Sequence, residues 1–174
     1  MSRLRQILSE TLDHLNNGII PFWLTRAEDA QFGGFFTNYD ERGDAYAMPE
    51  KYLNSQCRLL WWFSHLTRKF PKHAEYRRLA DYGLAFLISK LWDSAHGGFF
   101  WKVQRDGSRL DEGKVSYGQS FAIYALSEHA LATGDKQSLE YACRTFDLMQ
   151  TFAADTLNGG YYENMEPDWS PASP

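Results

Sequence analysis

Arg58 is the residue whose type and setting point most directly to chemistry. It lies in a densely apolar run, where an uncompensated charge costs several kcal/mol, so its guanidinium must be paired or must face a polar cavity. Asn54 and Trp61 lie four residues before it and three after it, so the three side chains share one helix face. Two interpretations stay open: a structural ion pair, or a polar and aromatic wall of the kind that sugar sites use.

A second aromatic face follows downstream. Tyr117, Phe121 and Tyr124 recur at the same helical spacing as the first set. On spacing alone, Tyr117 is explained as well by core packing as by contact with a ligand. The two faces correspond when Lys51 is aligned with Lys114, and this alignment also superposes Gln56 on Gln119, Arg58 on Phe121, Trp61 on Tyr124 and Ser64 on Ser127.

A long repeat organises the chain. Pairs of glycines begin at Gly33, Gly97 and Gly159, which are 64 and 62 residues apart. Each pair follows an Asp by four residues and precedes two aromatic residues, as expected of a short β-hairpin. We interpret the repeated Asp as part of the hairpin geometry and not as an acid/base pair. A period of this length indicates a repeat architecture.

Hydrophobic periodicity predicts five helices, over residues 2–16, 50–68, 72–91, 115–133 and 136–153. Asn17 and Gly18 are predicted to end the first helix. The second and fourth helices are apolar on all sides, whereas the other three have a single apolar face. This alternation predicts an all-α toroid in which inner helices are enclosed by outer helices and joined to them by the glycine-pair hairpins.

Composition narrows the classes of function. The 174 residues carry a net charge of −4 and no basic run, so nucleic acid is not expected as a partner. The N-terminus lacks the apolar segment of a signal peptide, and no stretch has the length of a membrane span, so we expect no membrane partner and a cytoplasmic protein. Aromatic residues make up 16% of the chain, more than core packing usually needs and suited to flat, amphipathic ligands such as sugars.

Other catalytic motifs are missing from the sequence. The five histidines have no metal-ligand spacing, and no Gly-x-Ser-x-Gly, P-loop or Gly-x-Gly-x-x-Gly motif occurs. Cys57 and Cys143 are isolated within helical segments and are expected to be buried free thiols. The sequence therefore predicts no metal site and gives no support to serine hydrolysis or nucleotide-dependent transfer.

The ordered set of motifs resembles the N-acylglucosamine 2-epimerase superfamily, which includes the cellobiose 2-epimerases. The resemblance rests on GGFF at 33–36, KYLNSQCRLLWWFS at 51–64, GGFFW at 97–101 and SYGQSFAIYALSEHALATGD at 116–135. It implies an (α/α)6 barrel, here about half of one, and an isomerase that acts at the reducing end of a mono- or disaccharide. The implied route removes and returns the C2 proton through a cis-enediolate and needs no metal or organic cofactor.

The resemblance also implies roles for individual residues. Arg58 matches the arginine that contacts sugar oxygens near C1 and C2, and Tyr117 matches a tyrosine that lines the same pocket. We expect these two to be catalytic, with Asn54, Trp61, Phe121 and Gln119 as substrate-binding residues. The acid/base histidines of the family lie in the second half of the barrel and match no position here.

We therefore expect residues 1–174 to be the N-terminal part of a single (α/α)6-barrel domain, apparently truncated. The complete enzyme would be a sugar 2-epimerase or an aldose–ketose isomerase. Two alternatives remain: an (α/α)-barrel glycoside hydrolase or lyase, and a non-catalytic half-barrel that binds sugar and forms a homodimer through its exposed apolar faces.

Overall fold

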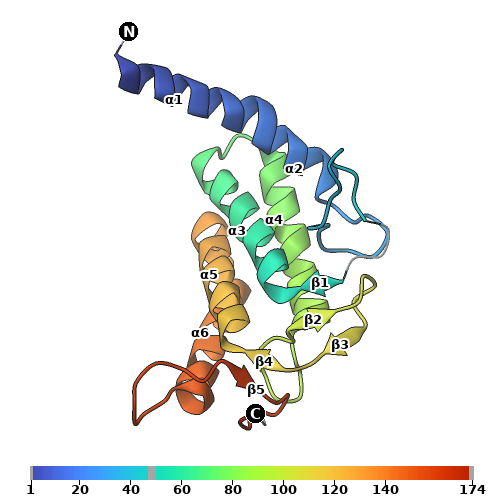
Figure 1. Ribbon diagram of the computed structural model, residues 1–174, viewed down its shortest axis with the longest axis vertical. Helices are drawn as coiled ribbons and strands as arrows, with labels where there is room; N and C mark the ends of the chain where they lie inside the picture. The colour runs from blue at the N-terminus through green and yellow to red at the C-terminus, as the bar shows by residue number, and fades with distance from the viewer. Residues whose placement is uncertain (1, 47–49, 173–174) are drawn as a thin grey trace.

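The computed structural model describes residues 2–46 and 50–172. Two antiparallel helix pairs form its body (Figure 1): α3 (Leu53–Lys69) with α4 (Ala74–Phe86), and α5 (Ser116–Thr133) with α6 (Lys136–Leu148). Helix α3 packs against both α4 and α5, and α5 packs against α6. Helices α3 and α5 therefore form an inner layer, and α4 and α6 an outer layer, as the alternation of apolar patterns predicts.

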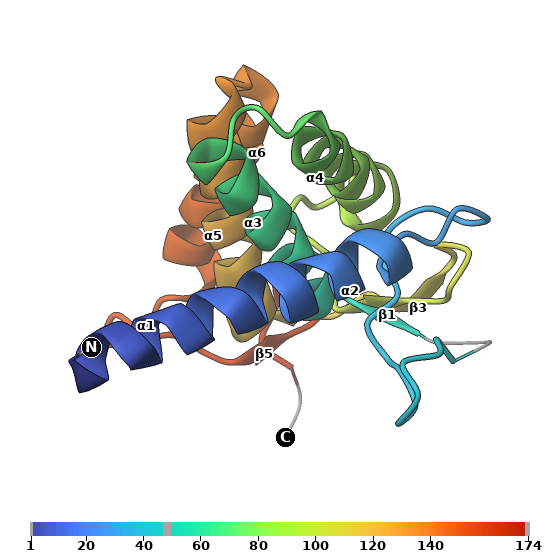
Figure 2. The same cartoon turned by 90° about the horizontal axis from the view of Figure 1, so that it is seen from above.

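The first predicted helix continues past its predicted end. Helix α1 (Arg3–His14) runs through a π-helical turn, η1 (Leu15–Ile19), into α2 (Ile20–Arg26). Gly18 therefore does not end the helix, because the wider π turn carries the chain through it and places Pro21 in the first turn of α2, where proline is tolerated. None of the side chains described for α1 is buried, and the helix extends away from the helix pairs (Figure 2).

Each glycine pair closes the same hydrogen-bonded loop. The amide of Asp93 donates to the carbonyl of Gly98 at 2.8 Å, and the amide of Gly97 donates back to the carbonyl of Asp93 at 2.9 Å. Asp29 and Asp155 make the equivalent pairs of bonds at the other two repeats. All six glycines have positive φ between 68° and 84°, which is open to glycine at no steric cost. The predicted threefold repeat of hairpins is confirmed.

Two small antiparallel sheets join the repeats. One has the order β1-β2-β3, formed by Lys51–Tyr52, Lys102–Val103 and Arg109–Asp111; the other pairs β4 (Lys114–Val115) with β5 (Asn164–Met165). In each case a strand that leads directly into an inner helix pairs with a strand of a following hairpin. Helices α3 and α5 therefore begin at the same end of the molecule and run parallel (Figure 1).

The apolar core lies between the two layers. One cluster fills the space between α3, α5 and the second hairpin, with Leu60, Phe99 and Leu126 among its most buried members. Another lies between α3, α4 and the first hairpin and includes Phe35 and Phe63. The π-helical turns η2 (Leu87–Leu91) and η3 (Met149–Ala153) extend the outer helices and lead into the second and third hairpins.

The apolar composition of the inner helices predicts that they are buried on all sides, but each of them has an exposed side. In the part of the chain that the structure describes, α3 leaves Arg58 exposed, and α5 leaves Tyr117, Ser120 and Tyr124 exposed. The three residues of α5 lie at spacings of three or four, so they share one open face, and Arg58 of α3 lies over Phe121 beside that face. Apolar composition could not distinguish this face from the buried one because aromatic side chains occupy both.

Candidate functional site

The open faces of α3 and α5 form one continuous surface. We call it the aromatic wall and define it by Arg58, Trp61, Tyr117, Phe121 and Tyr124. The Arg58 guanidinium lies 5.1 Å from the centre of the Phe121 ring, a cation–π contact. Trp61 stacks on Tyr124 with ring centres 5.0 Å apart and planes 14° apart. Each of these pairs joins residues 63 apart, so equivalent positions of the two repeats touch across the wall.

The exposure of Arg58 differs from the prediction made from its sequence neighbours. The apolar run around it predicts a buried guanidinium, but Arg58 is exposed. Its neighbours Leu59 and Leu60 point into the core, and one helical step turns Arg58 toward the open face. Because Arg58 is exposed and lies over the Phe121 ring, the interpretation as a buried ion pair is wrong, and a contact with ligand oxygen atoms stays a prediction.

A hollow in the wall lies beside the contact between Tyr117 and Phe121. Their rings meet edge to face at 4.9 Å, and Tyr117 is 44% exposed. Beside them a hollow of about 370 Å³ is lined by Ser120, Phe121 and Tyr124. Aromatic faces with a hydroxyl group are a typical lining for a small polar ligand with apolar C–H faces. Asn54 is half-buried and lies at the position of α3 equivalent to Tyr117.

Gln119 does not belong to the wall, and its assignment as a substrate contact is corrected. Its side chain is completely buried; its Oε1 accepts from the Phe99 amide at 2.9 Å and its Nε2 donates to the Phe99 carbonyl at 2.7 Å. Gln56 binds the backbone of Phe35 in the same way, at 2.8 Å for both bonds. Both amides hold a hairpin against an inner helix. The recurrence of glutamine in the repeat was the sequence signal for this role.

The repeated Asp residues also act on the hairpins. Lys114 donates to Asp93 at 2.8 Å, and both side chains are buried. Burial alone would raise the pKa of Asp93, but the hydrogen bonds from Lys114 and the Ala95 amide hold this pKa below its ordinary value. Lys51 pairs in the same way with Asp29 at 2.9 Å. The interpretation of these carboxylates as hairpin geometry is confirmed, and the role of the two lysines is a finding of the structure.

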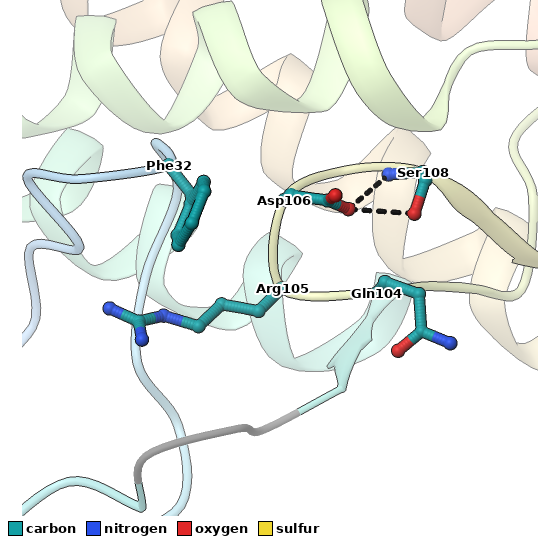
Figure 3. A pocket seen from close by; sticks show the side chains of 5 residues that line it. All are labelled: Phe32, Gln104, Arg105, Asp106 and Ser108. Atoms are coloured by element: carbon teal, nitrogen blue, oxygen red, sulfur yellow. Dashed lines mark hydrogen bonds between the residues drawn. The ribbon is translucent and has the colours of Figure 1, made fainter.

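A second hollow lies between the first two hairpins, and its charged side chains hold the two hairpins together. Figure 3 shows Arg105 beside Phe32, with Asp106 hydrogen-bonded to Ser108 across the turn. Arg105 donates to both carboxylate oxygens of Asp29, at 2.8 and 3.1 Å, and lies 5.1 Å from the centre of the Phe32 ring. These contacts tie the second hairpin to the first, so the charged groups of this hollow serve the fold.

Several other expectations can be compared with the structure. Cys57 is buried, and burial raises the pKa of its thiol. Cys143 is exposed, contrary to prediction, because it faces outward from α6.

Among the described residues, no three His, Cys, Asp or Glu side chains come together in a way that could hold a metal ion. None of the helices described is long and apolar enough to cross a membrane.

Parallel inner helices backed by outer helices, with hairpins at one end and an aromatic wall on the inner face, define the chain as about half of an (α/α)-barrel protein. A family model described as N-acylglucosamine 2-epimerase (GlcNAc 2-epimerase) matches residues 34–173. The chain belongs to this family.

Individual relatives agree with this assignment. A cellobiose 2-epimerase of Dictyoglomus turgidum is 36% identical over 170 residues, which are 97% of this chain and 42% of that protein. A D-mannose isomerase of Marinomonas mediterranea is 30% identical over 82% of this chain and 35% of that protein. The structure of the cellobiose 2-epimerase from Spirochaeta thermophila matches with a TM-score of 0.92 and 38% identity, covering 98% of this chain and 42% of that one. The chain thus spans less than half the length of these relatives.

Proposed function

We propose that the protein is a sugar isomerase that acts at the reducing end of an aldose, by C2 epimerisation or by aldose–ketose isomerisation. The observation that carries this proposal is the exposed Arg58 guanidinium, held over Phe121 on an aromatic wall. Membership of the N-acylglucosamine 2-epimerase family supports it, since the relatives compared above are named as epimerases or isomerases. Cellobiose- and N-acylglucosamine-type aldoses are the substrate classes to test first.

In the proposed reaction the sugar ring opens and the C2 proton is removed, which leaves negative charge on the enediolate oxygens. Arg58 binds these oxygens and stabilises the charge as it develops. Tyr117 contacts the same end of the sugar, while Asn54, Trp61 and Phe121 bind its hydroxyl groups and C–H faces. Histidines outside this chain serve as acid and base. The scheme assigns no metal or organic cofactor.

We also propose the setting in which this site works. Residues 1–174 are the N-terminal part of a single barrel domain of a cytoplasmic protein. Exposed apolar side chains on the free sides of α5 and α6, including Leu131, Leu139 and Phe146, are available to pack against the remaining helices of the barrel. A homodimer of the complete protein is a separate proposal.

Substitution of Arg58 by alanine in the native enzyme tests the proposal. Turnover of the aldose should fall about 100-fold or more, because the charge that stabilises the enediolate is lost. Proton exchange at C2 in D₂O, followed by NMR, measures this step directly. Arg144→Ala is a matched control, since Arg144 also lies over an aromatic ring, 4.8 Å from the centre of Trp92, but on the outer helix α6.

The same assay separates the alternatives. An epimerase leaves the glycosidic bond of a disaccharide intact, whereas a hydrolase releases monosaccharides. Wild-type turnover in Arg58→Ala would overturn the role of Arg58. Sugar binding without C2 exchange in the native protein would favour the non-catalytic half-barrel instead.

A further inference from the structure

A cluster of charged side chains lies on the inner helices further from the hairpin end than the aromatic wall. Glu128 of α5 is buried, with its side chain only 8% exposed. Arg68 of α3 donates to both of its carboxylate oxygens, at 2.8 and 3.2 Å. The Nδ1 atom of His65, also on α3, lies 3.0 Å from the Oε1 atom of Glu128. One buried carboxylate thus holds two side chains of the neighbouring helix.

The His65 ring connects this cluster to the wall. It stacks on Trp61 with ring centres 4.8 Å apart and planes 14° apart. Trp61 in turn stacks on Tyr124 at 5.0 Å and 14°. The three rings are therefore nearly parallel, and the first of them is held by Glu128.

The contact of His65 with Glu128 is also the third in a series. Arg58 with Phe121, Trp61 with Tyr124, and His65 with Glu128 each join residues 63 apart. The three contacts follow one another along the two parallel helices. They differ in chemistry: a cation on a ring, two stacked rings, and a ring nitrogen on a carboxylate. Only the third contains a buried charge, which is costly unless its partners are in place.

We propose that Glu128 is a positioning residue that sets the orientation of Trp61 and Tyr124 in the aromatic wall, acting through His65. Glu128 fixes the plane of the His65 ring, and stacking transmits this plane to Trp61. Arg68 pairs with both oxygens of the buried carboxylate and so keeps it in place on the side away from the wall. The inference rests on the proposed function only in assigning a sugar as the ligand of the wall.

A purely structural clamp between α3 and α5 makes a different prediction from a positioning residue. A clamp changes the melting temperature alone. A positioning residue also changes the asymmetric environment of the Trp61 and Tyr124 rings, and with it the fit of the wall to a ligand. Near-ultraviolet circular dichroism reports the first change, and the split between KM and kcat reports the second.

The experiment compares Glu128→Gln with the wild-type native enzyme. Glutamine has nearly the same shape but lacks the charge that binds Arg68 and His65. We expect the near-ultraviolet dichroism of the aromatic residues to weaken. We also expect KM for the sugar to rise about tenfold, the size of one lost ring-stacking contact, with kcat within about twofold of wild type. Glu128→Asp, which keeps the charge, should restore part of both signals.

Glu28→Gln is the matched control. Glu28, in the first hairpin, accepts from Arg78 of the outer helix α4 at 2.8 Å. Glu28→Gln therefore also removes a carboxylate–arginine bond, but one that involves neither inner helix. It should leave both the dichroism and KM unchanged. If Glu128→Gln lowers the melting temperature yet keeps the wild-type dichroism and KM, the positioning role is overturned.

A second variant keeps the inference testable if Glu128→Gln does not fold. His65→Ala removes the stacked ring but leaves the ion pair between Arg68 and Glu128. The same rise in KM and loss of dichroism support the proposal, and unchanged values overturn it. If the native protein turns over no sugar, the proposed function fails, and the dichroism still decides whether Glu128 fixes the rings.

Discussion

At the scale of single residues, polar side chains on the inner helices lie in two different environments. Polar residues on an apolar helix predict ligand contacts, and Arg58 lies on the open face, where such a contact requires it to be. Gln119 does not, because its amide is buried and hydrogen-bonds to both the N–H and the C=O group of Phe99. The difference is one of helix face, which residue type alone does not reveal.

Replacement of Gln119 by leucine tests the structural role of this amide. The substitution keeps the volume but leaves the buried N–H and C=O groups of Phe99 without partners, at about 1–3 kcal/mol for each. The free energy of unfolding, measured by urea denaturation, should therefore fall by about 2–5 kcal/mol. Gln137→Leu, at an exposed position in the first turn of α6, should change it by less than about 0.5 kcal/mol. A loss as small as that in Gln119→Leu would refute the clamp.

At the scale of elements, the glycine-pair hairpins are the recurring unit. The three copies share their backbone hydrogen bonds, but their surroundings differ. At the second hairpin Trp169 is buried, and its indole N–H donates to the Gly97 carbonyl at 3.2 Å. A Cβ atom on Gly98 would lie 2.4 Å from the Trp169 ring, whereas a Cβ atom on Gly160 would meet no described atom within 4 Å.

This contrast yields a paired prediction for Gly98→Ala and Gly160→Ala. Both substitutions force alanine into the left-handed region, at φ of 73° and 80°, and each costs about 1–2 kcal/mol for that reason. Gly98→Ala must also displace Trp169, which should cost about 1–3 kcal/mol more. Thermal denaturation should show the larger drop in melting temperature for Gly98→Ala. Equal drops would mean that close packing on Trp169 is not what requires glycine there.

At the scale of the whole molecule, buried ion pairs connect each of the first two hairpins to the inner helix that follows it. Lys114 opens the strand that leads into α5 and binds Asp93 of the second hairpin, while Lys51 does the same for α3 and the first hairpin. Because the two pairs join residues 21 and 22 apart and are buried, they couple the stability of the hairpins to that of the helices.

The pH dependence of stability should report these pairs. The folded pKa of Asp93 lies below its ordinary value of 3.8, so below that pH the unfolded state binds more protons than the folded state. The contribution of Asp93 is therefore complete above pH 3.8 and is lost as the pH falls through the folded pKa. Urea denaturation between about pH 6 and about pH 3 should show this decline.

Asp93→Asn should flatten that decline and lower stability at neutral pH by about 3–5 kcal/mol, because Lys114 is left buried without its carboxylate. Asp147→Asn, at an exposed position on α6, should leave the curve parallel to that of wild type. If the curve of Asp93→Asn declines as steeply in acid as that of wild type, the acid sensitivity arises elsewhere.

The sequence by itself determined the repeat, the alternation of inner and outer helices, and the aromatic positions of the wall. These follow from the spacing of apolar and aromatic residues, because each type of secondary structure places its buried side chains at a characteristic period. It also located Arg58 and Tyr117, although not which side of their helices would be open.

Only the tertiary structure decided which polar groups lie on the wall and which are buried and hydrogen-bonded within the fold. Gln119 lies two residues after Tyr117, yet one is buried against a hairpin and the other is exposed. No sequence pattern marks Glu128 as special. Its proposed role depends on contacts with Arg68 and His65, which lie 60 or more residues away in the sequence. The physical reason is that burial and pairing depend on which elements pack together, and a single helix does not encode its neighbours.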